Sequence, residues 1–153
     1  MVNEILQYTD IDVNDDANIL LVSEYVNDIY EYLRKLEVQY EIRENHLKGQ
    51  TEVLPKMRAV LIDWINDVHL QYRFMQETFH MAVSIIDRYL QASTRTTRKN
   101  LQLVGITALF IASKYEELYP PEVKDFVYIT DDTYNRNQVL DMEKHILKVS
   151  RAL

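Results

Sequence analysis

The chain has 153 residues, of which 47% are hydrophobic and 27% charged, and it carries a net charge of −7 with no cysteine. This composition is typical of a folded globular domain, and the lack of cysteine excludes disulfides, thiolate zinc sites and a cysteine nucleophile. With two glycines and three prolines, the chain is poor in the residues that form the many turns of a sheet protein. We therefore expect an all-α protein, without a membrane segment because no apolar run reaches about 18 residues.

Apolar residues recur at helical spacing along most of the chain and predict the order of its elements. Residues 1–18 are acidic and weakly periodic, so we expect a flexible arm there. Pro55 suits the first turn of a helix, and Asp131, Asp132 and Thr133 offer N-caps to the last helix. The expected helices span about residues 19–40, 55–72, 76–92, 99–117, 121–128 and 134 to the C-terminus.

The fourth predicted helix is apolar on nearly all sides. Between Leu101 and Ala112 only Gln102 and Thr107 are polar, and a helix of this kind has to be buried all round. Gly105 in its middle costs about 1 kcal/mol of helix propensity relative to alanine, which the close approach of a neighbouring helix could offset. We expect a bundle wrapped around this helix and preceded by one extra N-terminal helix.

Three predicted helices place a charged residue where their pattern calls for an apolar one: Arg58, Lys114 and Glu143. An unpaired charge in an apolar face is costly, so each needs a partner. For Arg58 the pattern favours Asp87, on the next helix, as a structural ion pair. For Lys114 and Glu143 an internal salt bridge and a site that faces another protein both remain open.

The second predicted helix carries an unusually wide apolar stripe. The stripe covers an arc of roughly 200°, whereas a helix with one buried face needs about 100° or somewhat more. Deep burial of the whole stripe is favoured over an exposed binding edge. The stripe consists of Met57, Val60, Leu61, Ile62, Trp64, Ile65 and Val68.

Sequence signals for catalysis, metals and nucleic acid are weak. The four histidines lack metal-binding spacing, and no metalloprotease, serine hydrolase or phosphate-loop motif occurs, so we expect no enzyme activity, metal or cofactor. The basic cluster Arg95, Arg98 and Lys99 is interpreted as a solvated loop in an acidic chain, not as a nucleic-acid patch. Glu116 and Glu117 are interpreted as a solvated helix end, because adjacent helical residues diverge.

A series of motifs resembles, in order and spacing, the first cyclin box of B-type mitotic cyclins. The stretch Met57–Trp64 is similar to the MRAIL-x-DW signature of that family, and the resemblance covers about residues 19–149. Further matching stretches are Ser84–Leu90, Leu101–Gly105, Ala112–Glu117, Tyr119–Glu122 and Ile129–Tyr134, with Ser23–Arg34 and Gln76–Thr78 pointing to the B-type branch.

The resemblance implies a five-helix cyclin fold over residues 50–149, behind an N-terminal helix over 19–40. It implies a regulatory subunit that binds and activates a mitotic cyclin-dependent serine/threonine kinase at G2/M, in cytoplasm and nucleus. Such an activator holds a mobile kinase helix inward and thereby completes a Lys–Glu pair in the kinase. The residues that match the kinase-binding positions of the family are Lys114, Glu143, Tyr25, Ile29, Ile111 and Tyr115.

The resemblance also implies a docking patch for arginine-x-leucine peptides of substrates or inhibitors, and no nucleic-acid or membrane partner. Asp67 matches the acid that helps to receive the arginine of the peptide, and Arg58 and Asp87 match an internal pair of the family. The residues that match the patch are Met57, Val60, Leu61, Trp64, Asp67, Leu101 and Gln102.

Two departures from the family leave alternatives open. The chain stops where the first repeat ends, whereas a full cyclin carries a second one, and residues 150–153 lack the family's apolar-aromatic ending. One alternative is therefore a truncated cyclin with weak or no kinase activation. Another is a cyclin-fold transcription-type adaptor, which would bind DNA through a basic face.

Overall fold

The computed structural model describes residues 11–12, 15, 18–94 and 96–150, and it divides the chain into two units, residues 1–41 and 42–153. Within the described part of the chain every regular element is helical, which confirms the all-α prediction. None of the described helices is long and apolar enough to cross a membrane. Most of the acidic arm expected over residues 1–18 lies outside the described residues.

The described part of the first unit contains two short 3-10 turns, Ile19–Leu21 and Ser23–Tyr25, followed by helix α1, Val26–Gln39. The expectation of one continuous helix from Ile19 is therefore wrong in its first part. Val22, between the two turns, has a φ of 49° in the left-handed region. An α-helix cannot continue through a residue in that conformation.

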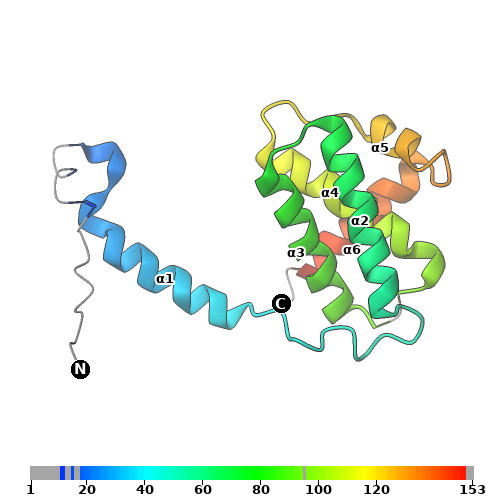
Figure 1. Ribbon diagram of the computed structural model, residues 1–153, viewed down its shortest axis with the longest axis horizontal. Coiled ribbons are helices and arrows are strands. Elements are labelled where there is room, and N and C mark those ends of the chain that lie inside the picture. Colours follow the sequence, from blue (N-terminus) through cyan, green and yellow to red (C-terminus); the bar gives the residue numbers. More distant parts are fainter. Residues whose placement is uncertain (1–10, 13–14, 16–17, 95, 151–153) are drawn as a thin grey trace, which may run out of the picture. The chain divides into compact units, whose positions relative to one another are not determined.

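Among its described residues the second unit contains five α-helices, packed as a bundle (Figure 1). The central helix α4 packs against α2, α3, α5 and α6, and all of its residues from 103 to 110 are buried. The burial predicted from its apolar sequence is thus confirmed. The helices are α2 (Pro55–Tyr72), α3 (Gln76–Ala92), α4 (Leu101–Glu116), α5 (Val123–Ile129) and α6 (Arg136–Ser150), with a 3-10 turn, η3 (Arg98–Asn100), before α4.

The close approach expected at Gly105 occurs between α4 and α2. A Cβ atom at this position would lie 2.6 Å from Leu61 Cδ1 and 3.1 Å from Leu61 Cγ. Because real Cβ atoms do not come so near to other heavy atoms, the leucine occupies space that only glycine leaves open. This contact sets α2 directly against the first half of α4, where the groove described below lies.

The sixth helix begins at Arg136, whereas the sequence pattern placed its start at Tyr134 and its N-caps at residues 131–133. Asn135 and Gln138 form the cap instead. The Asn135 backbone N donates to Gln138 Oε1 (2.9 Å), and the Gln138 backbone N donates to Asn135 Oδ1 (3.0 Å). The two aspartates at 131 and 132 have a φ of 53° and lie in the preceding turn, so they cannot serve as caps.

The fifth helix begins at Val123, so Pro121 precedes it and does not open it as expected. Glu122, in extended conformation, is the N-cap, and its backbone N donates to Asp125 Oδ2 (2.8 Å) in a capping box. Reciprocal bonds of this kind satisfy the N–H groups that a helix start leaves unpaired.

Glu117, interpreted from the sequence as a solvated helix end, has a structural role. Its Oε1 atom accepts hydrogen bonds from the Met75 backbone N (2.7 Å) and from Thr78 Oγ1 (2.5 Å). Thr78 is fully buried at the first turn of α3. The carboxylate therefore ties the end of α4 to the start of α3, where the positive end of the helix dipole favours a negative charge.

Candidate functional site

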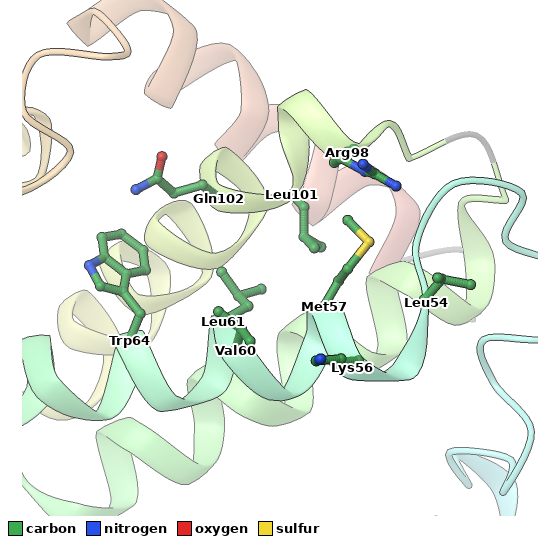
Figure 2. Close-up of a pocket in the computed structure, with 9 residues that line it drawn as sticks. All are labelled: Leu54, Lys56, Met57, Val60, Leu61, Trp64, Arg98, Leu101 and Gln102. Carbon is green, nitrogen blue, oxygen red and sulfur yellow. The ribbon is translucent and has the colours of Figure 1, made fainter.

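An apolar groove of about 530 Å³ lies between α2 and the start of α4 (Figure 2). Figure 2 shows Trp64 at one end of the groove and Leu54 and Arg98 at the other. The volume is within the range of sites that bind small ligands or side chains of a peptide. The groove is lined by Leu54, Lys56, Met57, Val60, Leu61, Trp64, Arg98, Leu101 and Gln102.

The apolar stripe of α2 divides into a buried part and an uncovered edge. Leu61, Ile65 and Val68 are buried, whereas 64% of Val60 is exposed and Trp64 is half-buried. The deep burial favoured by the pattern is therefore wrong for this edge. Helices α3 and α4 pack against α2, but they do not cover the whole width of its apolar arc. The uncovered part of the arc forms one wall of the groove.

A second, smaller hollow of about 340 Å³ meets the groove at Trp64, which lines both. Asp67 lies in this hollow and does not line the groove itself. Tyr128, from the end of α5, and Asp131, from the following turn, line the same hollow. The sequence pattern suggested Asp131 only as a helix cap and did not single out Tyr128. The two carboxylates make the hollow suitable for a cation. Its lining is Trp64, Asp67, Val68, Gln71, Tyr128, Ile129 and Asp131.

Arg58 on α2 and Asp87 on α3 form a bidentate ion pair. Arg58 Nε donates to Asp87 Oδ1 at 2.5 Å and Nη2 donates to Oδ2 at 2.7 Å. The hydrogen bond with Asp87 raises the pKa of Arg58 above its usual value. His46 Nε2 lies 3.3 Å from the same Oδ1 atom. Asp87 is buried, and neither member lines the groove, so the pair has a structural role.

Lys114 and Glu143 also contact each other, through a salt bridge from the last turn of α4 to α6. Lys114 Nζ lies 4.3 Å from the centre of the Phe110 ring, within the range of a cation–π contact. Of the two alternatives that the sequence left open, the salt bridge is present. It is not sealed, however, because 42% of the Lys114 side chain and 14% of the Glu143 side chain remain exposed.

Two exposed apolar side chains lie within about one helical turn of this salt bridge on α4 and α6. Tyr115 is 79% exposed beside Lys114, and Leu147, one turn after Glu143, is 47% exposed, while Ile111 is half-buried. Leu147 was not among the predicted contacts, although its spacing of one helical turn from Glu143 could have identified it. We call Ile111, Lys114, Tyr115, Glu143 and Leu147 the α4–α6 edge. Tyr25 and Ile29, the other two predicted contacts, belong to the first unit.

The described residues contain no cluster of three or more histidine, cysteine, aspartate or glutamate side chains that could hold a metal ion. The surfaces that stand out are an apolar groove with an acidic hollow at one end, and a charged edge with exposed apolar side chains. Such surfaces suit the recognition of other proteins. Fold and site together are those of a helical module whose surfaces suit the binding of other proteins.

Comparison with known proteins specifies the module further. The family model described as "Cyclin, N-terminal domain" matches residues 28–149. The chain therefore belongs to the cyclin family. The viral cyclin from herpesvirus saimiri, a solved structure, aligns with a TM-score of 0.72 and 27% sequence identity over 80% of this chain and 53% of the viral chain.

Curated relatives confirm the resemblance to the B-type branch. The chain is 63% identical over 139 residues to G2/mitotic-specific cyclin-B of Drosophila melanogaster. This alignment covers 91% of the chain and 26% of the relative. Identity to the same-named protein of Spisula solidissima is 56%, covering 94% of this chain and 33% of the relative. Identity to G2/mitotic-specific cyclin-B1 of Xenopus laevis is 52%, in an alignment that covers 95% of this chain and 36% of the relative. The chain thus spans about a third or less of the length of these relatives.

Proposed function

We propose that the chain binds and activates a mitotic cyclin-dependent kinase in the control of cell division, in the cytoplasm and the nucleus, without contributing a catalytic group. The observation that carries this proposal is the salt bridge of the α4–α6 edge, whose lysine is 42% exposed, together with the exposed apolar side chains of Tyr115 and Leu147 on the same two helices. An activator of this kind shifts a two-state kinase by binding its active state better than its inactive state.

The salt bridge between Lys114 and Glu143 leaves capacity for a partner. An ammonium group has three N–H donors and a carboxylate has two acceptor oxygens, and the pair uses Oε1 of the glutamate. Both side chains can therefore bond to kinase groups while they hold each other in place. Tyr115 and Leu147, both exposed within about one helical turn of the pair, provide apolar contact area. Tyr25 and Ile29, in the first unit, are proposed to contact the kinase as well.

The groove is the proposed docking site for arginine-x-leucine peptides of substrates or inhibitors. The leucine would fill the apolar part between Val60, Leu61 and Leu101. The arginine would enter the hollow beyond Trp64, where Asp67 and Asp131 supply carboxylates. The rings of Trp64 and Tyr128 line the same hollow, and aromatic faces attract a guanidinium group.

A crossed experiment tests both surfaces. Purified chain is titrated by calorimetry against a mitotic cyclin-dependent kinase and, separately, against an arginine-x-leucine peptide. Lys114→Glu is expected to weaken kinase binding about tenfold or more and to leave peptide binding unchanged. Trp64→Ala is expected to weaken peptide binding by a similar factor, as loss of a central aromatic contact does, and to affect the kinase less.

Circular dichroism of both variants provides the control for folding. Equal loss of both activities in either variant would contradict two separate surfaces, and no kinase binding by the unchanged chain would contradict the main proposal. Because the chain spans only part of its relatives, activation is measured apart from binding, as the rate at which the kinase phosphorylates a substrate with and without the chain.

A further inference from the structure

The docking groove and its hollow carry opposite charges at their two ends. Lys56 and Arg98 line the groove at the end away from the acidic hollow, next to Leu54 and Met57 (Figure 2). Asp67 and Asp131 line the hollow beyond Trp64 at the other end. The chain as a whole has a net charge of −7, so two basic side chains that line an apolar groove stand out on its surface. We call Lys56 and Arg98 the basic rim; among the described residues, the carboxylate bonded there, that of Glu52, accepts from the Arg98 backbone.

The two basic side chains of this rim are available to a ligand. Both residues are exposed, and neither side chain forms an ion pair with any residue that the structure describes. The Arg98 backbone N donates to Glu52 Oε2 at 3.0 Å, which fixes the start of η3 and with it the position from which the guanidinium extends. Lys56 is the second residue of α2, so the backbone of that helix sets the position from which its side chain extends.

The length of the groove sets the spacing of the ligand's charges. Asp67 and Lys56 lie on α2 a little over three turns apart, which corresponds to about 16 Å along the helix axis. An extended peptide covers about 3.3 Å per residue, so roughly five residues separate the side chains that meet the two ends. With an arginine in the acidic hollow and a leucine two residues later in the groove, the basic rim lies about three residues beyond the leucine.

We infer that this groove selects docking peptides that carry an anionic side chain, a carboxylate or a phosphoserine, about three residues after the leucine. The inference rests on the proposed docking function and names the class of peptide that the groove prefers. Lys56 and Arg98 would attract the anion, and a phosphate accepts charge-assisted hydrogen bonds from lysine and arginine side chains. The peptide would thus match the charge of the groove along its whole length.

The test compares peptides that differ at one residue. Four fluorescent arginine-x-leucine peptides carry serine, glutamate, phosphoserine or lysine three residues after the leucine, and their affinities for the full chain are measured by anisotropy. Relative to serine, we expect glutamate to tighten binding about threefold, as exposed ion pairs do, phosphoserine about tenfold, and lysine to weaken it. The gains should shrink as salt is raised toward 1 M.

Variants of the chain identify the residues that bind the anionic side chain of the peptide. Lys56→Glu and Arg98→Glu are each expected to remove most of the advantage of the phosphoserine peptide over the serine peptide. Lys48→Glu, an equal charge change at an exposed lysine outside the groove, is the matched control and should retain it. A further peptide with its phosphoserine before the arginine should gain nothing over serine.

The outcomes separate this inference from the function on which it rests. If the serine peptide binds but glutamate and phosphoserine bring no gain, or if Lys48→Glu removes the gain as effectively as Lys56→Glu, the inference is overturned and the docking proposal stands. If none of the peptides binds, the docking proposal fails and the inference fails with it.

Discussion

The ion pairs Arg58–Asp87 and Lys114–Glu143 join helices of the same bundle but in different surroundings. Each connects residues 29 positions apart. In the first pair the side chains are 28% and 10% exposed and the arginine bonds to both oxygens of the aspartate. In the second pair the lysine is 42% exposed and the glutamate 14%, and the lysine bonds to one oxygen of the glutamate.

The difference shows that one sequence pattern can serve two purposes. In both cases a charge interrupts an apolar helix face and needs a partner. Where the pair lies between α2 and α3 with its hydrogen bonds satisfied, it contributes to the stability of the bundle. At the α4–α6 edge the lysine has more solvent access than Arg58 has in the first pair. We therefore expect loss of this second pair to cost less stability, and its lysine can bind a partner.

The largest expected effect is the loss of stability on Asp87→Ala. The change leaves the guanidinium of Arg58 without its partner between two packed helices, and we expect the free energy of unfolding to fall by about 3 kcal/mol, the lower end of the range for a broken buried pair. Urea denaturation followed by circular dichroism measures it. Asp63→Ala, at an exposed position of α2, is the control and should change stability by less than about 0.5 kcal/mol. A similar loss in both variants would count against the structural role of the pair.

An intermediate effect is expected from exchanging the charges of the second pair. The double variant Lys114→Glu with Glu143→Lys can rebuild the salt bridge, so we expect its stability to change by less than about 1 kcal/mol. Kinase binding should nevertheless stay weakened about tenfold or more, because the partner now meets reversed charges. Calorimetric titration against the kinase checks this, and recovery of full affinity in the double variant would show that only the salt bridge itself matters.

The smallest expected effect separates charge from geometry in the first pair. Arg58→Lys keeps the positive charge but cannot form the two parallel bonds of a guanidinium group, so we expect a loss of about 1 kcal/mol in the free energy of unfolding. The opposite change, Lys114→Arg, should leave stability within about 0.5 kcal/mol because that pair is more exposed. Denaturation of the two variants side by side tests the contrast, which equal losses would refute.

Much of the fold was predictable because it depends on local periodicity. The bounds of α2 and α3 and the central position of α4 follow from the spacing of apolar residues, and Gly105 indicated a close helix contact that the structure shows with Leu61. The helix starts that depend on caps were less predictable. Asn135 competes with the aspartates before it, and only the observed backbone conformation decides between them.

The candidate site, like the fold, has features that the sequence predicts and others that only the structure reveals. The sequence alone determined that the chain is helical, that α4 is buried and that Arg58, Lys114 and Glu143 need partners, since these properties depend on neighbours within one helix. Only the tertiary structure decided that Val60 and Trp64 remain at least partly uncovered, that Asp131 and Asp67 line one hollow, and that Glu117 bonds to the start of α3. These properties depend on the angles and distances between helices, which the periodicity of a single helix does not contain.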